Sequence, residues 1–363
     1  MPTLREVSGN ASSIHSFGQD ARLLVESARL QVAELLRCEP KEVVFTSGGT
    51  ESDNLAILGT VRAAAGGRKH VVTTAIEHPA VLQTCRQLER EGVSVDCVAV
   101  GSSGVVDIAA VRAALSPETV LVSVMHANNE LGTIQPVAEI AEAAHAVGSL
   151  LHCDAVQSAG KLPIDVDALG VDLLTISGHK LYAPKGAGAL YVRKGAEIES
   201  IQFGGRHERA RRPGTENVPG IVGLGAACEL ARQRLVQESS RQEALRDRLE
   251  RAIVGQIPNT WVNAGDSPRT PNTTNIGFAG IEGEPLLISL DLKGFAVSSG
   301  AACSSGAVEP SHVLLAIGLS RQQARSCLRL SIGRGTAEED IDHFLAVLPG
   351  VVERLRTLAP AER

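Results

Sequence analysis

The chain has 363 residues, of which 44% are hydrophobic, and a formal net charge of −6. This length suits two domains with sizeable cores. Charges of both signs are interspersed, which argues against nucleic acids and membranes as partners and leaves small molecules and proteins. The first residues form no apolar signal segment, and no run is long enough for a membrane span, so we expect a cytoplasmic protein.

The first part of the chain alternates between helical and strand patterns. Helices are expected at 19–37, 79–91, 108–115 and 137–147, and strands at 42–46, 69–74, 93–100, 119–125, 149–153 and 171–176. The Gly/Pro-rich stretch 181–189 is expected to be a surface loop. Such alternation with short connections predicts an α/β fold, with a largely parallel sheet flanked by helices.

The second part begins after a Gly- and Arg-rich loop at 202–217. A long helical pattern over 218–255, broken near 238–240, is expected to bridge two domains. Beyond it we expect strands at 275–278, 295–298 and 325–332, and helices at 284–291, 311–317 and 338–358. We therefore predict a large domain over residues 1–255 and a smaller α+β domain over 256–363.

The cysteines are odd in number and form no C-x-x-C pair, which indicates reduced thiols. No spacing fits zinc ligands, and no metal site is expected. Six of them lie in periodic or apolar stretches and are expected in the core, namely Cys38, Cys85, Cys97, Cys153, Cys228 and Cys327. Cys303 instead lies among small residues at 298–307, a stretch that predicts an exposed, mobile loop carrying a nucleophile.

One glycine turn is a candidate phosphate cradle. Ser47, Gly48, Gly49 and Thr50 follow an expected strand and open a helix. Glycines let backbone amides approach closely, and a helix N-terminus favours anions. The alternative is an ordinary capped turn.

Polar residues also follow several expected strands. They are His78, then Asn128, Asn129 and Glu130, then Asp154 and Gln157, and finally Ser177, His179 and Lys180. Each could be a cap or packing residue by itself, but together they predict a site at the carboxyl ends of the strands. Lys180 would serve as a Schiff-base lysine for a carbonyl cofactor, although most lysines are solvated surface charges.

Arg329 stands inside the apolar stretch 327–332 and needs an anionic partner there. A substrate carboxylate would serve, and so would an internal ion pair.

The residues now carry a family resemblance. It runs from about Gly9 to about Asp342 through the segments 46–52, 77–78, 126–130, 154–157, 177–180, 212–215, 298–305 and 329–334. The sequence resembles pyridoxal-phosphate-dependent cysteine desulfurases of the nitrogen-fixation and iron–sulfur-cluster assembly type. These belong to the class V aminotransferase group of the fold-type I enzymes, whose large domain holds a largely parallel sheet of the seven-stranded type.

The resemblance implies a role for each matching residue. Lys180 matches the lysine bonded to pyridoxal 5'-phosphate, His78 the ring stacked on it, Asp154 the partner of its ring nitrogen and Gln157 the donor to its phenolic oxygen. The phosphate contacts are matched by Gly49 and Thr50 in the glycine turn, by Ser177 and His179, and by Thr215, which reaches the neighbouring subunit of a homodimer. Asn129 and Arg329 match ligands of the substrate carboxylate, and Cys303 matches the persulfide-forming cysteine.

The activity implied is conversion of L-cysteine to L-alanine, with sulfur passing to Cys303 and then to an iron–sulfur scaffold or another acceptor protein. Two departures stand out. The family's N-terminal small-domain segment is expected to be missing, and Arg206 replaces the third glycine of a usual glycine run. Three alternatives stay open: a selenocysteine lyase, another aminotransferase-type enzyme of this group, and a non-catalytic sulfur carrier or scaffold partner.

Overall fold

The computed structural model describes residues 9–64, 67, 69–299 and 309–358. The chain groups into two compact units. The first unit holds the chain up to Val98, together with Val106–Ala127 and Gln135–Leu235. The second unit holds Ala99–Val105, Asn128–Ile134 and the chain from Val236 onward. Two short excursions from the first half of the chain therefore belong to the second unit.

The first unit is built on a 7-stranded sheet with the order β1-β7-β6-β5-β4-β2-β3. Its strands are β1 (Val43–Thr46), β2 (His70–Thr74), β3 (Ser94–Val98), β4 (Thr119–Met125), β5 (Leu150–Asp154), β6 (Leu173–Ser177) and β7 (Gly188–Val192). β7 pairs antiparallel with both β1 and β6, whereas the pairs from β6 to β3 are parallel. The largely parallel α/β fold predicted from the sequence is confirmed.

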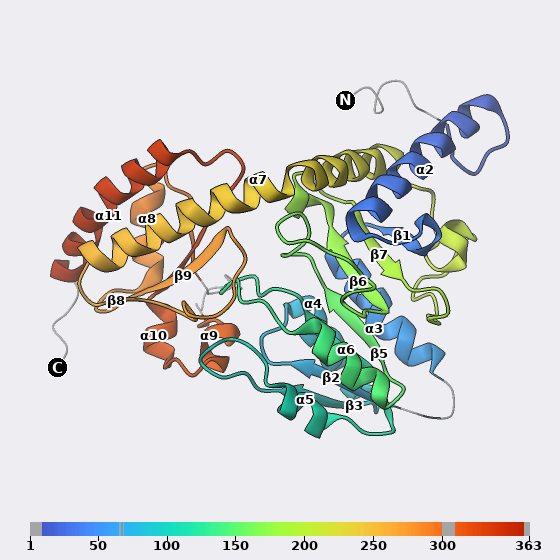
Figure 1. Ribbon diagram of the computed structural model, residues 1–363, viewed down its shortest axis with the longest axis horizontal. Coiled ribbons are helices and arrows are strands. Elements are labelled where there is room, and N and C mark those ends of the chain that lie inside the picture. The colour runs from blue at the N-terminus through green and yellow to red at the C-terminus, as the bar shows by residue number, and fades with distance from the viewer. Residues whose placement is uncertain (1–8, 65–66, 68, 300–308, 359–363) are drawn as a thin grey trace. The chain divides into compact units, whose positions relative to one another are not determined.

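Helices cover both faces of this sheet, with α6 on the near side of the strands and α3 behind them in Figure 1. The helices are α2 (Ser16–Leu36), α3 (Gly49–Ala63), α4 (Pro79–Arg90), α5 (Ile108–Ala114) and α6 (Val137–Ala146). Local chemistry sets where they begin. The Asp107 carboxylate accepts from the Ala109 amide at the start of α5, and Pro79 occupies the first position of α4.

The second unit combines a 4-stranded antiparallel sheet with helices. Its order is β10-β11-β9-β8, from β8 (Thr260–Val262), β9 (Thr273–Phe278), β10 (Ser298–Ser299) and β11 (Cys327–Ser331). Its helices beyond Gln256 are α8 (Gly283–Asp291), α9 (His312–Ala316), α10 (Arg321–Arg325) and α11 (Glu338–Leu358). Phe278, Leu286, Leu328 and Leu348 form its core, as expected of the smaller α+β domain.

Helix α7 (Val218–Gln256) is continuous, so the predicted break near 238–240 is wrong. Polar residues there pair within the helix instead of ending it. The Glu238 carboxylate accepts from Arg241 and from Gln242, three and four residues further on. Such pairs stabilise helical backbone, which is why the polar stretch did not require a turn.

The expectation of a loop over 181–189 is wrong at its end, because Gly188 opens the buried strand β7. A Cβ at Gly188 would lie 2.6 Å from the Cα of Gly48, so a larger residue would push the two backbones apart. The sequence-based prediction also missed β8 and α10, both of which are short.

Of the cysteines expected in the core, Cys97 is exposed and Cys38 is half-buried. Cys97 lies on β3, the edge strand of the large sheet, where only the last residue, Val98, is buried. An edge strand is covered by a neighbouring strand on one side only, which explains why the apolar pattern around Cys97 misled the prediction.

Among the described residues, no helix is both long enough and apolar enough to span a membrane.

Candidate active site

The first unit brings its candidate residues to one edge of the sheet. Asp154 is the last residue of β5, and Ser177 is the last residue of the neighbouring parallel strand β6. Lys180 follows at once in a short 3₁₀ helix, Gly178–Leu181. The carboxyl ends of parallel strands are where α/β sheets bind ligands, so the sheet topology places Asp154 and Lys180 where such chemistry occurs.

Asp154 is buried, and its carboxylate accepts a hydrogen bond of 2.9 Å from the amide of Val156. Burial raises the pKa of Asp154 to about 6, and the Val156 amide and the Lys180 ammonium group oppose that rise. The charge of Lys180 therefore interacts electrostatically with the Asp154 carboxylate. At neutral pH Asp154 is a buried carboxylate with a cationic side chain nearby.

The glycine turn lies against the end of β6. A Cβ at Gly49 would sit 2.9 Å from Val156 Cγ2 and 3.6 Å from Ser177 Cβ, so the start of α3 meets the loops that follow β5 and β6. The Ser177 hydroxyl and the ring of His179 lie 3.0 Å apart. The amides of the first turn of α3, the Ser177 hydroxyl and His179 thus converge on one place, a donor set that suits a phosphate.

The loop that carries Thr215 is tied to the same helix start. Arg212 forms a two-pronged ion pair with Glu51 in the first turn of α3, at 2.7 and 3.3 Å. Burial would raise the pKa of Glu51, but hydrogen bonds from Arg212 and Ser47 outweigh burial and lower it. Thr215 itself is exposed. The pair therefore holds the loop while leaving Thr215 accessible.

His78 and Gln157 complete the group in the first unit. His78 is exposed at the start of α4, where its Nδ1 accepts from the amide of Ala80 at 3.1 Å. Gln157 is half-buried in the turn after Asp154. The main-chain carbonyl oxygen of Gln157 accepts a hydrogen bond of 2.8 Å from the amine of Lys161.

Lys161 was not among the residues predicted from the sequence. Burial and then the nearby charge of Lys180 lower the pKa of Lys161 to about 8. A second amine therefore stands near Lys180. Its one signal in the sequence is its place four residues after Gln157, a spacing that one helical turn brings together.

Asn129 and Arg329 belong to the second unit. Arg329 on β11 donates to the backbone carbonyl of Asn129 at 2.9 Å and to the Ser298 hydroxyl at 3.0 Å. It is half-buried, and its contact is with the main chain of Asn129. Neither partner is anionic, so no carboxylate saturates Arg329 through these bonds.

Glu130, which also follows β4, stands near Arg329. Burial raises the pKa of Glu130 to about 7, against the opposing effects of the Ser311 hydroxyl and the Arg329 charge. Among the described residues, the buried Nε of Arg329 has no hydrogen-bond partner. Arg329 therefore retains one N–H donor that no described residue uses.

Cys303, the predicted nucleophile, lies outside the described residues. The two described residues just before its segment, Ser298 and Ser299, form β10 and pair with β11. In that pairing Ser298 stands opposite Arg329.

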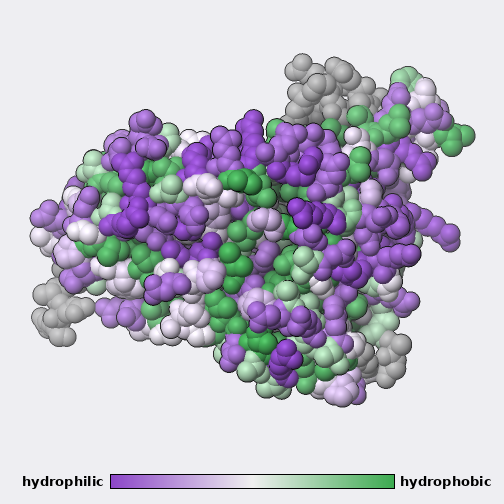
Figure 2. Space-filling model, viewed as in Figure 1, coloured by the Kyte–Doolittle hydropathy of each residue, from purple (hydrophilic) through white to green (hydrophobic). Residues whose placement is uncertain are grey.

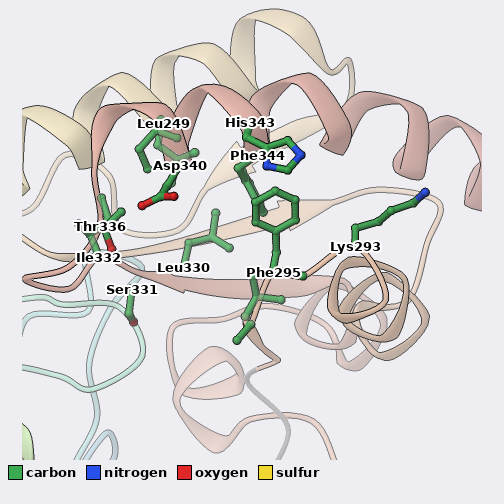
Figure 3. Close-up of a pocket in the computed structure, with 14 residues that line it drawn as sticks. Leu249, Lys293, Phe295, Leu330, Ser331, Ile332, Thr336, Asp340, His343 and Phe344 are labelled. Carbon is green, nitrogen blue, oxygen red and sulfur yellow. The ribbon is translucent and has the colours of Figure 1, made fainter.

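A separate cavity of about 410 Å³ lies within the second unit, and none of the predicted site residues lines it. Figure 3 shows Phe295 beside His343 and Phe344 on its wall, with Lys293 and Asp340 near its margins. The Phe295 ring meets the rings of His343 and Phe344 edge-on, with centroids 5.0 and 5.2 Å away. This cavity is distinct from the residues that carry the candidate chemistry.

The fold and this arrangement define an enzyme of the aminotransferase type. The family model for class-V aminotransferases matches residues 1–344, and the chain belongs to that family. It is 48% identical to a cysteine desulfurase of Gluconacetobacter diazotrophicus, over 99% of this chain and 90% of that protein.

Two solved structures are similar along most of the chain. One is a NifS-like protein, with a TM-score of 0.91 and 36% identity, covering 98% of this chain and 94% of the other. The second is SspA in complex with cysteine, with a TM-score of 0.81 and 36% identity, covering 91% of this chain and 92% of the other.

The cofactor of this family is pyridoxal 5'-phosphate, and the residues of the first unit fit it. A buried carboxylate suits a protonated ring nitrogen, and a lysine near that carboxylate suits the aldehyde. Gly49 keeps the start of α3 close to Ser177, as a phosphate cradle requires.

Proposed function

We propose that this chain is a cysteine desulfurase that converts L-cysteine to L-alanine and collects the sulfur on Cys303 as a persulfide. The observation that carries this is the buried Asp154 carboxylate, whose raised pKa is held down by the charge of Lys180. The glycine turn lies at the same edge of the sheet, where Gly49 meets Val156 and Ser177. Support also comes from the relatives named cysteine desulfurase and from the neighbour that holds cysteine.

We assign the cofactor-binding residues by their places at the sheet edge. Gly49, Thr50, Ser177 and His179 would hold the phosphate, and Lys180 would hold the aldehyde carbon. Pyridoxal phosphate supplies an acceptor for the electrons left when a proton leaves the Cα of a bound amino acid. The Asp154 carboxylate keeps a proton on the ring nitrogen, because that proton neutralises an otherwise buried charge.

Three further side chains complete the proposed reaction. His78, which is exposed at the start of α4, would cover the ring, and the half-buried Gln157 would donate to the phenolic oxygen of the cofactor. Lys180, once displaced by the substrate amine, serves as the base for the proton at Cα. The amine of Lys161 stands nearby, and burial and then the charge of Lys180 lower the pKa of Lys161 to about 8.

Sulfur transfer is assigned to Cys303. Its thiolate attacks the substrate sulfur and forms an S–S bond, while the electron pair of the broken C–S bond stays with the substrate carbon, which then takes up a proton. The product is alanine and a persulfide on Cys303. That sulfur is then available to an iron–sulfur scaffold or to another acceptor protein.

The experiment that tests this function supplies L-cysteine to the purified, cofactor-loaded chain with a reductant. We expect alanine and sulfide in equal amounts. With selenocysteine we expect slower turnover. Faster turnover of selenocysteine would favour a selenocysteine lyase, and absence of both products would contradict the proposal.

Arg329 is proposed to bind the substrate carboxylate. Arg329→Gln should weaken substrate binding by roughly 1.5–3 kcal/mol, the range for hydrogen bonds to charged groups, because the free Nε donor and the charge are both lost. Steady-state kinetics would show this as a raised KM. Arg329→Lys, which keeps the charge but loses the planar fork, should recover part of the loss. A KM unchanged in both variants would return Arg329 to a purely structural role.

A homodimer is proposed as the working form, with Thr215 reaching the phosphate of the partner subunit. Helix α2 exposes Phe17, Leu23 and Leu30, at 68%, 69% and 49%, and the last two lie seven residues apart on one face. Figure 2 shows hydrophobic residues at the outer end of α2. Large apolar side chains exposed together indicate a protein interface.

The dimer has a simple test. Leu23→Glu should shift the sedimentation coefficient of the protein from that of a dimer to that of a monomer, because it places a charge on the exposed face of α2. Val254→Glu is the matched control, since Val254 is also exposed, at 46%, but lies on α7. A dimer that survives Leu23→Glu, or a monomeric unmodified chain, would contradict this assignment.

We also propose that the large cofactor-binding domain spans residues 1–255 and that the small domain, 256–363, carries the cysteine loop. The cytoplasm is the proposed compartment. All six cysteines within the described residues are free thiols, as expected in a reducing environment.

A further inference from the structure

A cluster of titratable groups lies buried beside Asp154. Asp53 on α3, Glu77 after β2 and His152 on β5 are 1%, 0% and 0% exposed. Asp53, Glu77 and Asp154 are close enough for their charges to interact. Three ionised carboxylates in such a volume would be very costly unless a cation balanced them.

His152 does not supply that cation. Its Nδ1 lies 2.9 Å from the Ser123 hydroxyl, and its Nε2 lies 3.0 Å from the Thr175 hydroxyl. Burial lowers the pKa of His152 to about 3, so the ring is neutral at physiological pH. Both ring nitrogens have hydroxyl partners, which satisfy a neutral imidazole fully.

Asp53 has the surroundings of a neutral acid. One carboxyl oxygen, Oδ1, lies 3.6 Å from Nε2 of His152. It has no hydrogen-bond partner in the part of the chain that the structure describes. Burial first, and then the charge of Asp154, raise the pKa of Asp53 well above its usual range, although the Thr175 hydroxyl bonds to the carboxyl.

The other groups that face Asp53 lead to the same result. Burial raises the pKa of Glu77 to about 8, although the Thr74 hydroxyl and the Met125 amide bond to its carboxylate. Burial likewise keeps the thiol of Cys153, next to Asp154, protonated. Asp154 differs because Lys180 lies near it, and its pKa is only about 6.

We propose that Asp53 is a positioning residue that holds a proton at neutral pH, which leaves Asp154 as the single ionised carboxyl of this cluster. Among these three carboxyl groups, Asp154 alone then carries a negative charge, at the edge of the candidate site. That this charge serves the ring nitrogen of pyridoxal phosphate rests on the proposed function. The protonation of Asp53 does not depend on that function, because it is argued from the burial of Asp53, its unpartnered Oδ1 and the carboxyl groups nearby.

Isotope-edited infrared spectroscopy tests the proton directly. The full chain is made by cell-free synthesis with aspartate carrying a 13C label in its side-chain carboxyl, so that Glu77 gives no shifted signal. We expect a protonated-carboxyl band at pH 7, with and without pyridoxal phosphate. It should vanish in Asp53→Asn and persist in Asp154→Asn. A wild-type spectrum without the band, or a band lost only in Asp154→Asn, would overturn the proposal.

The pH at which Asp154 ionises gives a second readout that a merely structural role would not move. In the unloaded chain the midpoint of the Asp154 carboxylate signal should lie near pH 6, and Asp53→Asn should leave it in place, because one neutral group replaces another. Were Asp53 ionised, removing its charge would lower that midpoint by about one unit or more. Such a shift would contradict the proposal.

The affinity of the variants for pyridoxal phosphate, measured by titration, tests whether Asp53 affects cofactor binding. Asp154→Asn should weaken pyridoxal phosphate binding by about 100-fold or more, since a buried charge loses its partner. Asp53→Ala should weaken binding by about tenfold, because the hydroxyl of Thr175 loses its carboxyl partner, and Asp53→Asn should recover most of that loss. An Asp53→Asn loss as large as that of Asp154→Asn would overturn the inference.

The two failures are distinguishable. If Asp154→Asn binds pyridoxal phosphate like the wild type, the proposed role of Asp154 toward the cofactor fails, while the infrared result in the unloaded chain still decides the protonation of Asp53.

Discussion

Lys180→Ala should produce a chain that no longer turns over cysteine and no longer holds pyridoxal phosphate by a covalent bond. Lys180 follows β6 directly, and its charge opposes the rise in the pKa of Asp154 that burial causes. The amine of Lys180 is therefore expected beside the proposed position of the cofactor ring. The variant should lose the yellow colour of a lysine-bound cofactor and retain only loosely bound pyridoxal phosphate. Absorption spectra after gel filtration, and alanine assays, measure both effects.

Two other lysines sharpen this test. Lys185 is exposed in the loop that follows, so Lys185→Ala should keep colour and turnover. Lys161 is the more demanding comparison, because its lowered pKa makes it the competing amine. Its hydrogen bond to the Gln157 carbonyl holds it in place, and we expect Lys161→Met to slow turnover without loss of the covalent bond. Wild-type turnover by Lys180→Ala would contradict the entire functional assignment.

Cys303→Ser should separate cofactor chemistry from sulfur transfer. The variant keeps Lys180, Asp154 and Arg329, so it should bind pyridoxal phosphate and respond spectrally to cysteine. It should nevertheless release almost no sulfide, because a hydroxyl does not accept sulfur as a thiolate does. Mass spectrometry of the wild type after exposure to cysteine should find added sulfur on the peptide that contains Cys303.

Cys97 provides the matched control, since it is the exposed cysteine among the described residues. Cys97→Ser should make sulfide at the wild-type rate. Added sulfur found mainly on the Cys97 peptide, or normal sulfide production by Cys303→Ser, would show that the persulfide assignment is wrong.

The strand ends were the part of the site that sequence reasoning could predict. Buried parallel strands read as short apolar runs, so Asp154 and Ser177 could be recognised as residues at strand ends. The same reasoning could not find Asp53 or His152. Both lie inside regular elements, on α3 and β5, where a polar residue resembles any other satisfied core group.

Errors in the fold prediction have a related cause. Strand β7 begins at Gly188, within a stretch whose glycines and proline are typical of a loop, and its pairing with β1 and β6 is visible only in the folded sheet. The unbroken α7 depends on the pairing of Glu238 with Arg241 and Gln242. The pairing of β7 is a tertiary contact, which local composition does not contain. The Glu238 pairs lie within one turn of α7, so their spacing was visible in the sequence and the polar composition of the stretch was given too much weight.

Contacts in the second unit join segments that are synthesised at widely separated times. Asn129 and Arg329 make their contact across 200 residues of sequence, and Glu130 meets Ser311 across 181. A ribosome adds about 5–20 residues per second, so the carbonyl of Asn129 is made roughly 10–40 s before Arg329, its hydrogen-bond donor. The residues proposed to hold the cofactor all belong to the first unit, which ends at Leu235 and is complete in the growing chain before Arg329 is added. The contacts among the residues of the first unit can therefore form during synthesis before the contact between Asn129 and Arg329 does.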